Sequence, residues 1–348
     1  MKRDAFFLGI LSIVLCTLIF STMEVMLKMP AVSGVFHPMQ ITVERFLIGG
    51  ICLIPFAAAS LKKKQVRLTA AHLRYSAMTG LLCVPLSMVL FQLAVSYGKA
   101  SVVAVLFSGN PIFVTVLAYL LLRETIHWNN ILALVLEVCG ILAIINPFSP
   151  GSSVSLLSVG LVILSALLFS SYSVLGKRMS QSCGGIVVTC LSFLFGGAEL
   201  LLLLLLGHLA PVTAFYEAVG LSIFSNVPFF SGINSVTLPY FLYICLINSA
   251  AGYVFHMLAL EKTGAHMTNL VFFFKPILAP LIAYFALREA ITSNMVVGIV
   301  FFLLGSLSGI IPTMIRSRKA AQALTAEVAA ETAEASTPQA LSPPSPNP

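Results

Sequence analysis

Two prolines inside long apolar runs each follow a polar side chain. Asn110 precedes Pro111, and Lys275 precedes Pro276. A proline within a helix removes a backbone donor and leaves a carbonyl without its helical partner. We therefore predict a helix break at each proline, with Asn110 and Lys275 placed to bind a substrate midway through a membrane. The alternative is that both prolines only shape packing, with Asn110 hydrogen-bonded between helices.

Lys275 is the more informative of the two polar residues. An ammonium group at the centre of a bilayer costs about 2.5 to 3.5 kcal/mol on the insertion scale, so it requires a wet cavity or a carboxylate. It can bind a substrate carboxylate or phosphate, or exchange a proton, and the structural alternative is a permanent ion pair. Glu24 lies four residues before Lys28. This helical spacing predicts that Glu24 pairs with Lys28 and not with Lys275.

Other polar residues in the apolar runs are candidates for a pathway or its gates. Glu44 and Arg45 are adjacent near the outer end of the second span and must point in different directions, so they cannot neutralise each other. Arg45 is a candidate for substrate binding or for a gate. Glu137 is predicted to be structural. The further candidates for substrate binding are His256 and Asn248. Those for gating or coupling are Glu44, Glu199, Arg123, Glu124, Arg288 and Glu289, and for the four residues of the Arg-Glu pairs the alternative is headgroup anchoring and capping.

The composition requires a membrane around these residues. Of the 348 residues, 59% are hydrophobic and only 9% are charged, with a mean hydropathy of +1.02. Such a chain cannot cover a water-soluble surface, which excludes a soluble enzyme, a nucleic-acid-binding protein and a fibrous protein. We predict an all-α polytopic membrane protein whose ten transmembrane helices are residues 5–28, 38–59, 75–96, 100–122, 129–146, 155–176, 184–206, 239–260, 265–287 and 293–315.

The basic residues predict how these helices are oriented. Most of the 19 lysines and arginines fall at the termini or in alternate connections, which places both termini in the cytoplasm. The connection 207–238 contains no Lys or Arg and is expected at the outer interface. Residues 316–348 turn to a low-complexity composition and are predicted to form a disordered cytoplasmic tail.

The sequence also repeats itself at an offset of 165 residues. Residues 100–126 and 265–291 share a proline, an Ala-Tyr pair and an Arg-Glu pair in register, and FSTMEVMLK at 20–28 resembles FSSYSVLGK at 169–177. We infer two repeats of five helices, 5–146 and 155–315. Because five is odd, the second repeat must enter the membrane in the opposite sense, and inverted repeats of this kind permit alternating access.

With these features the chain resembles the EamA branch of the drug/metabolite transporter superfamily. The resemblance covers residues 5–315 and rests on the ten spans, the proline-bearing fourth and ninth spans ending in LLRE and ALRE, and PMQITVERFLIGG in the second span. It implies an exporter or exchanger of small metabolites. It also implies a role for Arg45, which occupies a position that is frequently basic in the family.

The function predicted from these features is secondary active transport across the cell (inner) membrane. The sequence has no P-loop, Rossmann fingerprint, HExxH or CxxC motif, so we expect no cofactor, no metal and no nucleic-acid partner. A basic central residue favours an anionic or amino-acid-like metabolite. Proton or ion coupling and a homodimer stay open, and the alternatives in other classes are a polytopic membrane enzyme and a channel.

Overall fold

The computed structural model describes residues 2–123, 128–146, 154–263, 265–268, 270–309 and 311. In these residues the chain is helical, and no strand occurs. The helices of the first half are α1 (Lys2–Lys28), α2 (Pro30–Ser33), α3 (Pro38–Lys64), α4 (Ala70–Leu81), the π-helix η1 (Leu82–Met88), α5 (Val89–Tyr97), α6 (Ala100–Ser108), α7 (Asn110–Leu122) and α8 (Trp128–Ile145). Those of the second half are α9 (Leu156–Cys183), α10 (Gly185–Leu206), α11 (Ala210–Ala218), the 3-10 turn η2 (Ser222–Phe224), α12 (Leu238–Leu242), the π-helix η3 (Tyr243–Ala251), α13 (Gly252–Thr263), α14 (Ala265–Thr268), α15 (Leu270–Leu287) and a last helix, Ser293–Gly309.

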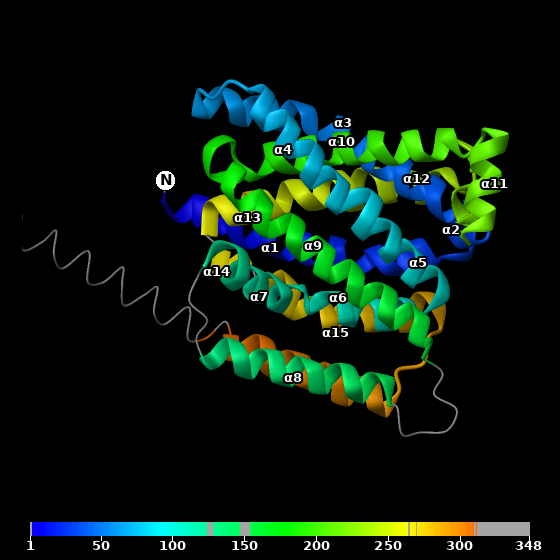
Figure 1. Cartoon of the computed structure of the whole chain (residues 1–348). Coiled ribbons are helices and arrows are strands. Elements are labelled where there is room, and N and C mark those ends of the chain that lie inside the picture. The colour runs from blue at the N-terminus through cyan, green and yellow to red at the C-terminus, as the bar shows by residue number, and fades with distance from the viewer. Residues whose placement is uncertain are drawn as a thin grey trace, which may run out of the picture.

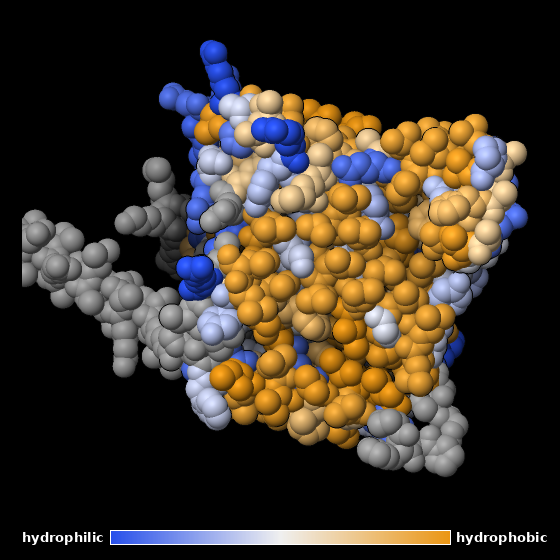
Figure 2. Space-filling view, viewed as in Figure 1, coloured by the Kyte–Doolittle hydropathy of each residue, from blue (hydrophilic) through white to orange (hydrophobic). Residues whose placement is uncertain are grey.

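These helices confirm the predicted fold class. Nine of the described helical segments are long and apolar enough to cross a membrane, and Ser293–Gly309 is a shorter apolar helix. Together they coincide with the ten predicted spans. Figure 1 shows them as a bundle in which α8 and the last helix form a separate layer along one side. The sides of the bundle are widely hydrophobic, and hydrophilic side chains gather at the end where the N-terminus lies (Figure 2).

The two halves interlock, and their contacts come in matching sets. The first span, α1, packs on α13 and α15, which are in the eighth and ninth spans. Its counterpart α9 packs in the same way on α5 and on α6 and α7, in the third and fourth spans. Exchanging the two halves therefore leaves the packing pattern unchanged, as a pseudo-twofold relation requires.

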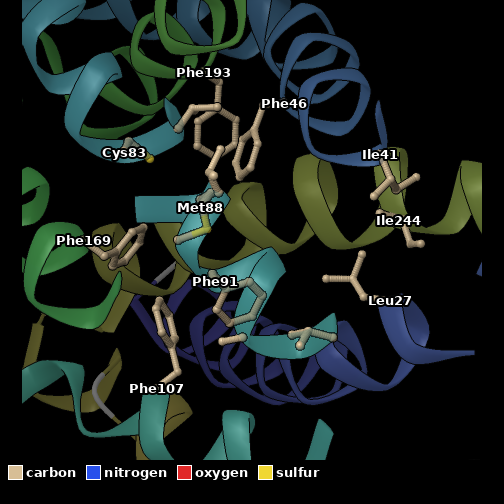
Figure 3. Close-up of a cluster of buried hydrophobic side chains, with 14 of the residues drawn as sticks. Leu27, Ile41, Phe46, Cys83, Met88, Phe91, Phe107, Phe169, Phe193 and Ile244 are labelled. Atoms are coloured by element: carbon tan, nitrogen blue, oxygen red, sulfur yellow. The ribbon is translucent and has the colours of Figure 1, made fainter. Parts of the chain in front are cut away.

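A short repeated sequence marks where the pseudo-twofold axis passes. Residues 46–50 read FLIGG on α3, and residues 193–197 read FLFGG on α10. The rings of Phe46 and Phe193 lie 4.7 Å apart, edge to face (Figure 3). A Cβ added at Gly50 would lie 3.0 Å from a methyl carbon of Leu194, and one at Gly197 would lie 2.8 Å from the matching carbon of Leu47. Because residues here touch their own counterparts, the axis runs between α3 and α10 at this height.

The third and eighth spans each contain a π-helical segment, which the sequence did not predict. Segment η1 contains Pro85, and its missing donor accounts for the widened turn. Segment η3 contains no proline, so no sequence signal marks it. π-Helical turns occur frequently at functional sites. Both segments pack against the helices that meet at the axis, η1 on α10 and η3 on α3.

The two proline-bearing spans differ, which corrects one prediction. In the fourth span the helix ends at Ser108 and restarts at Asn110, so that Pro111 occupies the first turn of α7, where a donor is not needed. In the ninth span α15 continues through both Pro276 and Pro280. The predicted break at Pro276 was wrong. Each proline removes one ladder hydrogen bond, and the surrounding helices can hold such a span together.

Candidate functional site

The centre of the bundle contains a buried ion pair that joins the two repeats. Lys275 Nζ of α15 lies 2.6 Å from Glu24 Oε1 of α1, and the two side chains are 6% and 0% exposed. Lys275 also lies 5.5 Å from the centre of the Phe107 ring. The second oxygen of Glu24 is buried and has no hydrogen-bond partner among the described residues. The pair is therefore incompletely solvated, with one acceptor left for a proton or a ligand donor.

The predicted pairing of Glu24 with Lys28 was wrong. Lys28 Nζ instead donates to the carbonyl oxygens of Val95 at 2.9 Å and Ser96 at 2.8 Å, at the end of α5. The helical spacing allows the local pair, but an ammonium without a carboxylate at the position of Lys275 costs more than one near the helix end. In the folded protein Glu24 therefore pairs with Lys275, the more deeply buried of the two lysines.

Arg45 is the second buried cation, and it has no such carboxylate. Its side chain lies on α3 next to Phe46 and is 0% exposed. Its guanidinium carbon lies 4.6 Å from the centre of the Phe46 ring and 5.9 Å from that of Phe91. Its terminal nitrogens lie 3.3 Å from the sulfur of Met23 and 3.8 Å from that of Met88. Arg45 directly precedes FLIGG and therefore lies next to the pseudo-twofold axis. The residue that directly precedes FLFGG is Ser192.

Asn110 does not join these charges but binds a helix of the other repeat. Its side-chain oxygen accepts a hydrogen bond from Ser170 Oγ on α9, and its backbone oxygen accepts another at 3.2 Å. Gly109, directly before it, packs so closely on α8 and the last helix that an added Cβ would lie 2.7 Å from Glu137 Oε2. Glu137 is buried there, and its structural role stays a prediction.

The two candidates of the eighth span both face the first span. Asn248, in η3, donates from Nδ2 to the Ile19 carbonyl at 2.7 Å and to Thr22 Oγ1 at 3.1 Å. Its side-chain oxygen is buried without a partner among the described residues. His256 lies between two rings, 6.1 Å from Phe20 and 6.2 Å from Phe272, with Nδ1 3.9 Å from Cys16 Sγ.

Glu44 points away from Arg45, as expected of adjacent helical residues. Its Oε1 accepts from the Phe230 backbone N–H at 2.6 Å and from Gln40 Nε2 at 3.3 Å. Gln40 also donates to the Ser231 carbonyl at 2.9 Å. The predicted outer connection is thereby fixed onto the start of α3. Glu199, on α10, is half-buried, and its Oε2 has no partner in the described part of the chain.

The Arg-Glu pair after α15 closes one end of the bundle. Glu289 accepts hydrogen bonds from the backbone N–H groups of Ala100 at 2.8 Å and Ser101 at 3.0 Å, and from Ser101 Oγ at 2.5 Å. Glu289, near the end of the repeated unit 265–291, thus caps the start of its copy, 100–126. We call this contact the Glu289 clasp. Arg123 and Arg288 are both exposed and end their helices with φ of 55° and 56°. Glu124 lies outside the described residues.

The site is therefore a set of three buried charges surrounded by rings and thioethers. Among the described residues no group of three His, Cys, Asp or Glu side chains could hold a metal ion. The sequence reasoning missed Glu24 as the partner of Lys275, Ser170 as the partner of Asn110, and Met23 and Met88 beside Arg45. The FLIGG and FLFGG repeat could have located the axis, whereas hydroxyl and thioether residues in apolar runs give no signal of their own.

Comparison with known proteins identifies the family. The description "EamA-like transporter family" matches residues 7–146 and again 156–308. An uncharacterized transporter of Clostridium kluyveri is 35% identical over 303 residues, which are 86% of this chain and 92% of that protein. The uncharacterized transporter YyaM of Bacillus subtilis is 23% identical over 80% of this chain and 87% of its own length.

A solved crystal structure shares the fold. It is 16% identical in sequence, has a TM-score of 0.55, and is matched over 89% of this chain and 98% of its own. The family matches cover both halves of the chain and coincide with its two repeats. The chain therefore belongs to the EamA-like transporter family and is a multi-pass membrane transporter.

Proposed function

We propose that this transporter is a secondary active carrier that works by alternating access, with its substrate bound among the buried charges between the two repeats. The observation that carries this proposal is the ion pair of Lys275 and Glu24, 2.6 Å apart and buried. It joins α1 of one repeat to α15 of the other. A substrate carboxylate can compete with Glu24 for Lys275, and this competition gives the ligand a different affinity for paired and unpaired states.

The arrangement of the repeats supports two such states. The helices that carry the pair lie in opposite repeats, so any rocking of one repeat against the other must strain or break the contact. The Glu289 clasp holds one end of the bundle together through hydrogen bonds to Ala100 and Ser101. Because the repeated unit also ends in Arg123-Glu124, the corresponding contact at the opposite end would involve Glu124. Alternate closure of the two ends is the cycle we propose.

The finer properties of the carrier follow the same reasoning. Two buried cations against one central carboxylate favour an anionic or amino-acid-like metabolite. We propose a location in the cell membrane with both termini in the cytoplasm, because basic residues concentrate in the termini and alternate connections. Transport would be export or exchange, and the free oxygen of Glu24 makes proton coupling the favoured form of energy input. A homodimer is compatible with this mechanism but is not required by it.

Counterflow in proteoliposomes tests the function. The full chain is reconstituted with unlabelled metabolite inside, and uptake of the same labelled metabolite is followed for a panel of carboxylates and amino acids. A carrier shows faster uptake when preloaded, a channel shows no acceleration, and an enzyme returns an altered molecule. Lys275→Met should lose the acceleration, and because it leaves the buried Glu24 carboxylate without its partner, its counterflow is compared at equal amounts of reconstituted protein. Full counterflow by Lys275→Met would refute the site.

A further inference from the structure

Arg45 differs from the other two buried charges of this site because it contacts thioether sulfurs and aromatic rings instead of an opposite charge. Its two terminal nitrogens meet thioether sulfurs at 3.3 and 3.8 Å, and its Nε has no hydrogen-bond partner in the part of the chain that the structure describes. A thioether is a weak acceptor, and a guanidinium has five N–H donors to satisfy. Within that same part of the chain no carboxylate lies within 4 Å of it. The guanidinium is therefore buried with most of its hydrogen-bonding capacity unused.

Of the three buried charges of this site, the positive charge of Arg45 has no negative partner within the described chain. Lys275 and Glu24 neutralise each other. Glu44, the next residue on α3, directs its carboxylate to the Phe230 backbone N–H at 2.6 Å, away from Arg45. A ligand with one negative charge would make the centre neutral. A zwitterion would leave it positive, and a dianion would make it negative, both at a cost in a medium of low dielectric constant.

The surroundings of Arg45 fit a flat apolar body behind that charge. Met88, Phe46 and Phe91 belong to one cluster of buried side chains, and in the view of Figure 3 Met88 is drawn between the two rings. The ring centre of Phe193 lies 4.7 Å from that of Phe46, and the ring centre of Phe107 lies 4.9 Å from that of Phe91. A methionine side chain is flexible enough to yield its place. A planar ring taking that place would meet aromatic faces and edges on both sides.

We propose that Arg45 binds the carboxylate of an aromatic monoanion, whose ring displaces Met88 from between Phe46 and Phe91. The carboxylate takes two parallel N–H donors of the guanidinium, the Nε–H that has no partner among the described residues and the terminal N–H that faces the sulfur of Met88. Substrate selection then rests on net charge and planarity. This inference rests on the proposed transport function and specifies its substrate class.

Direct binding to the purified full chain tests the proposal with five probes. Labelled benzoate is the reference, cyclohexanecarboxylate lacks the aromatic ring, and benzylamine reverses the charge. Phenylalanine carries an ammonium beside its carboxylate, and 3-phenylpropanoate, which should compete with benzoate, is its matched monoanion. We expect benzoate to bind about fivefold more tightly than cyclohexanecarboxylate, which is the scale of one aromatic contact. Phenylalanine and benzylamine should not compete. Equal competition by phenylalanine would overturn the charge argument, and equal affinity for both carboxylates would overturn the ring argument.

Variants of Arg45 separate binding from folding. Arg45→Met should abolish benzoate binding and melt at the same temperature as the wild type or higher, because it removes a buried charge without a carboxylate. Lys62→Met removes a charge from the exposed end of the same helix and should change neither property. Arg45→Lys keeps the charge but loses the fork and should bind benzoate about tenfold more weakly. Wild-type benzoate affinity in either Arg45 variant would refute the proposal. If Arg45→Met does not fold, the affinity of Arg45→Lys alone decides.

The two proposals fail differently. If benzoate neither binds nor exchanges while another metabolite shows counterflow, the aromatic monoanion is wrong and the carrier function stands. If benzoate binds through Arg45 but no labelled compound shows counterflow, the binding site stands and the carrier function is wrong.

Discussion

The same helix junction occurs twice in this molecule, once charged and once neutral. In one copy α1 meets α15 through Glu24 and Lys275. In the other α9 meets α7 through Ser170 and Asn110. Lys275 and Asn110 occupy matching positions, each directly before the repeated proline. On the aligned first helices of the two halves, Ser170 matches Ser21 and Glu24 matches Ser173. Duplication therefore supplied equivalent positions on α7 and α15 but different partners on α9 and α1, and only one of the two junctions now carries charge.

The backbone differs along with the side chains. The neutral junction lies at a break, where α6 ends at Ser108 and α7 begins at Asn110. The charged junction lies on the unbroken α15. A hydrogen bond between uncharged groups fixes a break in place at little cost, whereas a buried ion pair has two states with very different energies. We propose that the neutral junction shapes the bundle and that the charged junction carries the chemistry.

The largest effect is expected when both charges of the charged junction are removed. Glu24→Ser with Lys275→Asn should reduce counterflow at least about 100-fold, because it removes an interaction of roughly 3 kcal/mol or more. The double variant should still fold, since no buried charge loses its partner. Lys275→Asn alone strands Glu24 and should be less thermostable than the double variant. The double-mutant cycle compares thermal unfolding and counterflow of Glu24→Ser, Lys275→Asn and the double variant. Near-normal counterflow by the double variant would mean that the charge has no transport role.

The Glu289 clasp gives the next largest effect. Glu289→Ala removes three hydrogen bonds from a carboxylate at the start of α6, and charge-assisted bonds contribute roughly 1.5 to 3 kcal/mol each. Faster hydrogen exchange is expected at residues 100–104, measured by mass spectrometry on the reconstituted chain. Glu217→Ala, an exposed glutamate on α11, is the matched control. Unchanged exchange at the start of α6 would show that the clasp does not hold this end.

The break at Gly109 can be tested by adding a single methyl group. In Gly109→Ala the new Cβ would lie 2.7 Å from Glu137 Oε2 and 3.0 Å from a ring carbon of Phe302. Overpacking of this kind costs about 1 to 3 kcal/mol and should lower the melting temperature. Gly160→Ala adds the same methyl on α9, where nothing lies within 4 Å, and should cause no comparable loss. Equal melting temperatures for the two variants would contradict the close packing at the break.

The smallest effect belongs to the neutral junction itself. Asn110→Ala removes the side-chain contact with Ser170 and leaves the contact of Ser170 Oγ with the backbone oxygen of residue 110. Hydrogen bonds between membrane helices contribute about 0.6 kcal/mol on average. We expect less than about a threefold change in counterflow. A loss as large as that of the charged junction would reverse the comparison and place Asn110 in the substrate site.

The residue sequence was sufficient to predict the framework of the fold. Apolar runs of membrane length predicted ten helices, and the repeated Pro, Tyr and Arg-Glu positions predicted two inverted copies. These signals are local or periodic, so they persist without knowledge of contacts. The same reasoning placed Lys275 in the interior, because a long charged side chain in the middle of an apolar run cannot reach water easily.

The partners of those charges could not be predicted in the same way. Glu24 had an acceptable partner four residues away in Lys28, and the three-dimensional packing of α1 on α15 gave it to Lys275, 251 residues distant. Helix η3 and the continuity of α15 through Pro276 likewise depend on neighbouring helices.

What the sequence by itself determined is thus which residues enter the membrane, how often the chain crosses it, and that the two halves are inverted copies. Only the tertiary structure decided which buried charge is paired and which is left open, because pairing depends on distances between helices far apart in the chain. Hydropathy measures the cost of burying Lys275 and Arg45, but the position of one carboxylate, on α1, makes an ion pair of the first and leaves the second among sulfurs and rings.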